Sequence, residues 1–149
     1  MNPGEMGVAK GEGGLGRILG RDLFLFLLDV EVKRARRYQN FLSILILRLV
    51  RDPLSLPGDG LADSHKFLAG LLMDEVRETD ILGVLDDDKF VALLPYADVS
   101  VGNHTRSRLE ALLQQCDLKR NGCDVMIQQI CFPKNGSSTI DLIKKTLEG

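Results

Sequence analysis

The sequence has no tryptophan, only two histidines and three cysteines, and its formal net charge is −2. The cysteines, Cys116, Cys123 and Cys131, form no Cys-x-x-Cys pair, and no histidine stands in metal-ligand spacing with them. We therefore expect free or buried thiols in a reducing compartment rather than a zinc site. A net charge this small gives no global field that would draw the chain onto nucleic acid, so an anion site must be a local cluster of Arg and Lys.

Long apolar runs are also missing. The longest, residues 41–47, is interrupted by Ser43, and the first residues show no basic stretch followed by an apolar one. The sequence predicts neither a transmembrane helix nor a signal peptide, and a cytoplasmic protein without a membrane partner. Residues 1–16 are rich in glycine and lack a periodic apolar face, which predicts a flexible leader before a single domain at 17–149.

The spacing of apolar residues predicts an alternation of helices and strands. Helices are expected at 18–40, 61–76, 99–116 and 138–147, with Ser138 or Thr139 as the cap of the last. Strands are expected at 42–50, 81–85, 90–94 and 124–132, the middle two forming a hairpin. This order implies an α/β sandwich whose central, mostly antiparallel sheet is flanked by helices.

The first predicted helix carries an apolar face and a basic end. The face at helical spacing comprises Leu23, Phe26, Leu27, Val30, Arg34 and Tyr38. The basic residues are Lys33, Arg34, Arg36 and Arg37. Cations at this end complement the helix dipole, and they form either a solvated helix end or a face that binds phosphate or a partner.

Two short motifs stand at a fixed distance from each other. Arg77-Glu78-Thr79-Asp80 is followed after five residues by the turn Asp86-Asp87-Asp88-Lys89-Phe90. The run 77–95, RETDILGVLDDDKFVALLP, resembles the centre of a GGDEF (diguanylate cyclase) domain, in which R-x-x-D, five residues, G-G-[DE]-E-F and an apolar strand follow in order. Weaker collinear matches, EVKRARRY, FVALLPYAD and FPKNGSS, extend the resemblance over residues 20–148 and imply the GGDEF, nucleotidyl-cyclase-like sandwich.

The resemblance also implies an active site, which this chain has lost in part. Diguanylate cyclases condense two GTP molecules with metal ions held by carboxylates, one set of which ends the first strand in an L-D-x-D-x-F segment. The matching positions here are Arg48 and Val50. Asp52 could substitute only if the strand slipped by two residues, a shift that preserves side-chain facing. The family's guanine-reading residues have no aligned counterpart, although Asp59 and Asp63 lie nearby.

At the hairpin turn the family's two glycines are Asp86 and Asp87, and its catalytic acid is Lys89, while Asp88 keeps the metal-ligand position. The glycines let the backbone approach the GTP phosphates closely, whereas two carboxylates would repel them. We therefore expect no cyclase activity, no catalytic residue and no cofactor. The acidic turn is either an ordinary solvated turn or a residual cation site.

In many GGDEF proteins the R-x-x-D motif is an inhibitory site for the product, cyclic di-GMP. The resemblance implies such a site at Arg77 and Asp80, with Arg108 of the third helix as its second arginine and His104 and Arg106 as further candidates. A guanidinium fork matches guanine O6 and N7 or two phosphate oxygens, and a carboxylate accepts from guanine N–H groups. The alternative is an ordinary surface ion pair between residues three apart.

These patterns favour a non-catalytic cyclic di-GMP receptor. Its ligand would bridge two copies of the domain or expose a surface to an unknown downstream protein. A second hypothesis is a degenerate protein-interaction module that binds no ligand and uses the basic first helix or a sheet edge. An active diguanylate cyclase is the remote third alternative.

Overall fold

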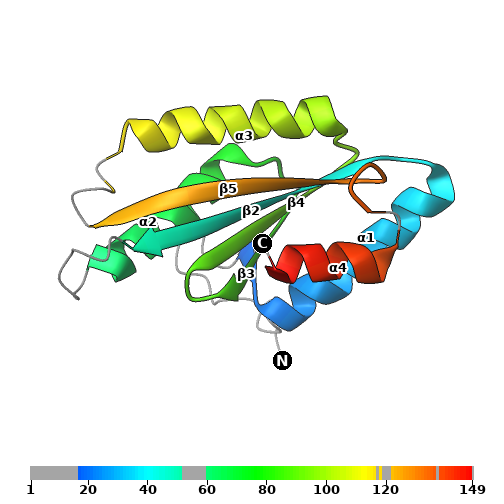
Figure 1. Ribbon diagram of the computed structural model, residues 1–149, viewed down its shortest axis with the longest axis horizontal. Helices are drawn as coiled ribbons and strands as arrows, with labels where there is room; N and C mark the ends of the chain where they lie inside the picture. The colour runs from blue at the N-terminus through cyan, green and yellow to red at the C-terminus, as the bar shows by residue number, and fades with distance from the viewer. Residues whose placement is uncertain (1–16, 52–59, 117, 119–121, 137, 149) are drawn as a thin grey trace.

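The computed structural model describes residues 17–51, 60–116, 118, 122–136 and 138–148, so the leader predicted at 1–16 lies outside the described residues. Its elements agree with the predicted strands and helices to within a few residues (Figure 1). In chain order they are β1 (Ile18–Leu19), α1 (Arg21–Tyr38), β2 (Leu42–Arg51), α2 (Gly60–Glu75), β3 (Ile81–Asp86), β4 (Lys89–Pro95), α3 (Val99–Gln114), β5 (Cys123–Phe132) and α4 (Thr139–Glu148).

The strands form one five-stranded sheet in the order β1-β3-β4-β2-β5. Only β1 and β3 pair in parallel, and the other neighbours are antiparallel, which confirms the predicted α/β sandwich with a mostly antiparallel sheet. The short strand β1 was not predicted, because its two residues directly precede α1 and continue the same apolar pattern. The cap predicted for α4 is confirmed at Ser138, whose Oγ accepts a hydrogen bond from the backbone N–H of Asp141 at 3.1 Å.

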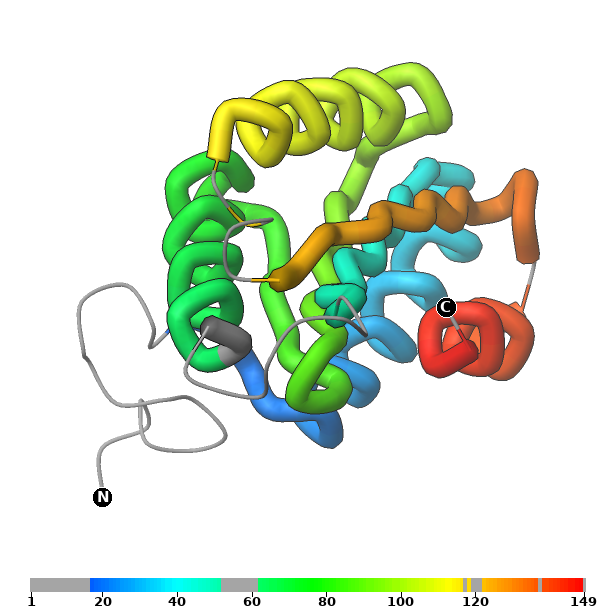
Figure 2. The backbone as a smooth tube through the Cα atoms, turned by 60° about the vertical axis from the view of Figure 1, so that its left-hand side comes forward, coloured from blue at the N-terminus to red at the C-terminus, as the bar shows by residue number. Residues whose placement is uncertain are grey.

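Helices cover both faces of the sheet (Figure 2). Leu45, Leu47 and Leu49 of β2 pack with residues of α2 and α3, while alternate residues of the same strand, including Ile44 and Ile46, pack with α1 and α4. Because β2 is buried on both faces, it appears in the sequence as a continuous apolar run rather than an alternating one. Each fully buried Leu or Ile contributes roughly 1.5–3 kcal/mol relative to an exposed position.

The predicted apolar face of α1 is wrong. The helix buries Phe24, Leu28, Val32 and Ala35 instead. Phe26 and Tyr38 of the predicted face are 62% and 63% exposed. The segment 23–28, LFLFLL, is apolar all round, so its local pattern allows either face. The buried face contains no charged residue over the whole helix, whereas the predicted one runs into Arg34, and only the uncharged face can lie on the sheet along its full length.

None of the helices in the described part of the chain is long and apolar enough to span a membrane. The three cysteines form no disulfide; Cys123 and Cys131 are buried on β5 and Cys116 is half-buried after α3.

Candidate functional site

The Arg77–Asp80 motif forms a compact turn between the end of α2 and the start of β3. The backbone N–H of Arg77 donates to Asp80 Oδ2 at 2.8 Å, and the backbone N–H of Asp80 donates to the Arg77 carbonyl at 3.0 Å. The guanidinium closes the same loop from outside, with Nε and Nη2 donating to Asp80 Oδ1 at 3.2 and 3.0 Å. The Asp80 side chain is 2% exposed and that of Arg77 53%, so the buried carboxylate anchors an accessible cation.

Arg17 also stabilises this turn, through a contact that was not predicted from the sequence. Its Nη2 donates to the Arg77 carbonyl at 2.5 Å and to the Asp80 carbonyl at 3.0 Å. The contact follows from the parallel pairing of β1 with β3, which brings Ile18 opposite Leu82. No local pattern signals a contact between residues so far apart in the chain.

Arg108, on α3, reaches the end of α2. Its Nε donates to Glu75 Oε1 and its Nη2 to the Glu75 carbonyl, both at 2.9 Å. Cations commonly bond the last carbonyls of a helix in this way. This contact places the Arg108 guanidinium beside the Arg77–Asp80 turn.

The structure brings Arg77, Asp80 and Arg108 to one surface pocket of about 370 Å³. The other residues that line it are Glu75, Ser100, Val101, His104 and Thr105. Of the two further candidates, His104 thus lines the pocket, whereas Arg106 pairs with Glu110 at 3.5 Å and is not among the lining residues. Two guanidinium groups balance two carboxylates here, so the lining offers both donors and acceptors of hydrogen bonds.

The acidic turn of the hairpin points to solvent, whereas the two residues after it are buried. Asp86, Asp87 and Asp88 are exposed, and Asp86 lies 3.9 Å from the Arg21 guanidinium. Phe90 is buried in the core and its ring centroid is 4.5 Å from that of His65 on α2. The backbone carbonyl of Asp88 accepts from the Leu49 N–H at 2.7 Å, which ties the turn to the end of β2.

Lys89, at the position of the family's catalytic acid, is buried and points to α4. Its Nζ donates to the Leu147 carbonyl at 2.8 Å, in the last turn of that helix. Arg48 of β2 is the direct cross-strand partner of Lys89, so the two basic residues that the resemblance aligns with acids lie at neighbouring positions of the sheet. The pairing of β2 with β4 is continuous from Leu42 and Pro95 to Arg48 and Lys89.

Of the remaining acidic candidates, Asp52, Asp59 and Asp63, the structure describes Asp63 alone. Asp52 and Asp59 lie outside the described residues, Val50 is half-buried, and Asp63 is exposed in the first turn of α2. In the described part of the chain, no three His, Cys, Asp or Glu side chains come together in a group that could hold a metal ion.

A larger pocket, of about 680 Å³, lies at the other side of the start of α3 and is lined in part by Phe41, Phe132 and Lys134. Its only carboxylate, Asp98, is already used as the helix cap, because it accepts from the Val101 N–H at 2.9 Å. No residue predicted for ligand binding lines this pocket.

The chain was compared with known proteins by sequence and by fold. No protein-family model matches it, and no curated protein matches it either. Solved structures do match. A DGC protein from Thermotoga maritima is 16% identical with a TM-score of 0.74, over 89% of this chain and 95% of that one. The FimX GGDEF domain from Pseudomonas aeruginosa is 18% identical with a TM-score of 0.74, over 95% and 91%.

The chain has the fold of a GGDEF domain. A third similar structure, the GGDEF domain of DgcB from Caulobacter crescentus in complex with c-di-GMP, is 13% identical with a TM-score of 0.68, over 87% of this chain and 78% of that one. At these identities the similarity establishes the fold alone. The function rests on this chain's own residues.

Proposed function

We propose that this GGDEF-fold chain is a non-catalytic receptor for cyclic di-GMP, which binds at Arg77, Asp80 and Arg108. The observation that carries the proposal is the meeting of two guanidinium groups, one from the α2–β3 loop and one from α3, in a single pocket of about 370 Å³. Two planar cations on separate elements can contact the guanine edge and the phosphate of the same ligand.

The two members of the R-x-x-D motif have different roles in this proposal. Arg77 is half exposed, and its side-chain hydrogen bonds to described residues come from Nε and Nη2, so Nη1 is the nitrogen that we expect to donate to a ligand. Asp80 is buried against that guanidinium and fixes its orientation, so it acts chiefly as a positioning residue. A direct bond from guanine N–H groups to Asp80 requires Arg77 to move aside first.

Residues of β2 and of the hairpin support the part of the proposal that this chain has no cyclase activity. Arg48 and Lys89 are cross-strand partners where acids would have to hold metal ions, and Lys89 is committed to the α4 carbonyl. The three aspartates of the turn add negative charge where the GTP phosphates would approach, which opposes binding through like-charge repulsion. GTP is therefore not the ligand of this chain.

Isothermal titration calorimetry with cyclic di-GMP tests the proposal. Wild type should bind, and Arg77→Ala should lose tenfold or more in affinity, because a lost hydrogen bond to a charged group costs about 1.5–3 kcal/mol. Asp87→Ala is the matched control on the exposed turn and should bind like wild type. Bound ligand should also stabilise the fold by about 2.7 kcal/mol at a hundredfold excess over Kd, with no comparable effect of GTP.

Two results would overturn this proposal. An absence of binding heat with wild type removes the receptor function, and a loss of binding in Asp87→Ala but not in Arg77→Ala moves the ligand to the former substrate cleft.

A second candidate, an interaction module that binds no ligand, is favoured by α1. Phe26 is 62% exposed on a face that also carries the half-buried Leu23, Leu27 and Val30. An exposed apolar face with basic residues beside it is a common protein-contact surface. If calorimetry shows no ligand binding, Phe26→Ser should then abolish association with a partner while leaving the melting temperature unchanged.

A further inference from the structure

Arg77 also contacts the last residue of β4, just before the turn that leads to α3. Its Nη2 donates to the backbone carbonyl of Pro95 at 3.0 Å, while the same nitrogen donates to Asp80 Oδ1. The Asp80 pair joins two opposite charges, whereas the Pro95 carbonyl is a neutral acceptor and therefore the weaker partner. A hydrogen-bond acceptor on a ligand therefore competes for Nη2 more readily with the Pro95 carbonyl than with the Asp80 carboxylate.

The residue after Pro95 has an uncommon backbone conformation. Tyr96 has φ 62°, in the left-handed region that non-glycine and especially bulky residues rarely adopt, and its side chain is 64% exposed. Because the Pro95 carbonyl and the Tyr96 N–H belong to one planar peptide unit, the orientation of that carbonyl restricts rotation about the Tyr96 N–Cα bond. The Arg77 bond thus helps to hold Tyr96 in this conformation.

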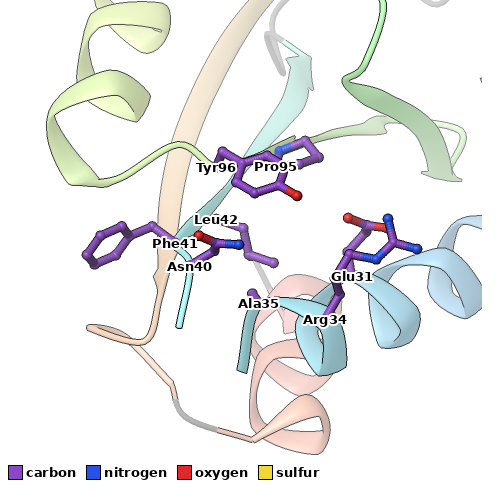
Figure 3. Close-up of a pocket in the computed structure, with 8 residues that line it drawn as sticks. All are labelled: Glu31, Arg34, Ala35, Asn40, Phe41, Leu42, Pro95 and Tyr96. Carbon is purple, nitrogen blue, oxygen red and sulfur yellow. The ribbon is translucent and has the colours of Figure 1, made fainter. Parts of the chain in front are cut away.

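Tyr96 borders a pocket on the α1 side of the turn, distinct from both pockets described above (Figure 3). Figure 3 shows its ring above the pocket with the hydroxyl end directed toward Glu31 and Arg34 of α1, while Phe41 points away. Tyr96 is not among the residues that line the Arg77 pocket. The bond from Arg77 to the Pro95 carbonyl connects that pocket to the Tyr96 backbone.

We infer that Arg77 couples its own pocket to Tyr96. When a ligand acceptor takes Nη2 from the Pro95 carbonyl, the peptide unit is free to rotate, Tyr96 leaves the left-handed region, and its side chain moves relative to Glu31 and Arg34. The inference rests on the proposed function, because the ligand is the trigger. It adds a path from the pocket to a different face of the molecule. The backbone link itself exists without ligand and can be tested alone.

Fluorine NMR of the full chain labelled with meta-fluorotyrosine reports on this link. The chain has two tyrosines, so Tyr38→Phe leaves Tyr96 as the only labelled residue. In the absence of ligand, Arg77→Ala should shift the Tyr96 resonance, because it removes the bond to Pro95. Arg108→Ala should not, because Arg108 bonds to Glu75. Saturating cyclic di-GMP should shift the resonance of the Tyr38→Phe protein in the same direction as Arg77→Ala.

Calorimetry on the same samples separates the possible failures. Binding heat with an unmoved Tyr96 resonance overturns the coupling and leaves the receptor function intact. A ligand-free Arg77→Ala resonance identical to that of its parent also overturns the coupling, whatever the ligand does. No binding heat overturns the receptor function and, with it, the ligand as the trigger.

Discussion

Lys89 donates its Nζ to the carbonyl of Leu147 at 2.8 Å, which joins the start of β4 to the last turn of α4. A cation at this place satisfies a terminal helix carbonyl and opposes the negative end of the helix dipole. Lys89 therefore has a structural role, because it links the hairpin to the C-terminal helix.

Lys89→Met should destabilise the fold while retaining most of the apolar stem. The lost charge-assisted hydrogen bond predicts a decrease of about 1.5–3 kcal/mol in the free energy of unfolding, measured by urea denaturation. Lys144→Met, at an exposed position of the same helix α4, is the control and should change it by less than about 0.5 kcal/mol. Equal losses in the two variants would show that the Leu147 contact contributes nothing of its own.

The purified protein should not convert GTP to cyclic di-GMP with magnesium or manganese. The reason is the cross-strand pair Arg48 and Lys89, which puts two cations where carboxylates would hold the metal ions. Chromatography of the nucleotides after long incubation is the measurement, with a mock purification as the control. Product that accumulates steadily above the mock sample would contradict this expectation.

Gly83→Ala should be destabilising because α1 packs directly on this residue of β3. A Cβ at Gly83 would lie 2.6 Å from the Phe24 ring, so the helix must shift, at a cost of about 1–3 kcal/mol. Gly70 of α2 is the matched comparison, because an added Cβ there meets nothing within 4 Å. Gly70→Ala should stabilise the protein by up to about 1 kcal/mol through its higher helix propensity. Thermal denaturation of both variants checks the opposite signs.

The positions of the elements were predictable because burial leaves a regular pattern in the sequence. The strands at 42–50 and 124–132 match β2 and β5 to within one residue at each end. The buried face of α1 was predicted wrongly because the apolar segment 23–28 fits either face, and only the absence of charge from the Phe24 face over the whole helix distinguishes the two. The short strand β1 was not predictable, because its stability comes from pairing with β3 rather than from its own two residues.

For the candidate site, the sequence supplied the residues and the structure supplied their contacts. The fixed spacing of Arg77, Asp80 and the hairpin carried the resemblance, and the fold places Arg108 beside them. The clamp by Arg17, the bond from Arg77 to the Pro95 carbonyl and the Glu75 partner of Arg108 join distant segments, and such pairs follow only from the assembled fold.

Arg108→Ala should weaken ligand-induced dimerisation more than it weakens binding of the ligand to a single domain. Arg108 belongs to a different element from Arg77 and reaches the pocket from α3. Sedimentation velocity with saturating cyclic di-GMP should show dimers for wild type and monomers for Arg108→Ala, although calorimetry still detects binding. Arg106→Ala, at a position of α3 that does not line the pocket and is paired with Glu110, should behave like wild type. Ligand-induced dimers of Arg108→Ala would contradict the bridging role.

Glu75→Gln should increase the affinity for cyclic di-GMP. The Glu75 carboxylate neutralises Arg108 within the pocket and repels an approaching phosphate, whereas an amide keeps an oxygen that can accept from Arg108 Nε. The charges are partly exposed, so the expected gain is about 0.4–1 kcal/mol, or about two- to fivefold in Kd. Because salt screens such interactions, the gain should shrink between low and high ionic strength in calorimetric titrations.

Glu110→Gln removes one negative charge from α3 outside the pocket and controls for net charge. If both variants gain affinity equally, the effect is a general one of charge, and if Glu75→Gln binds more weakly than wild type, the carboxylate is needed to hold Arg108 in place for the ligand.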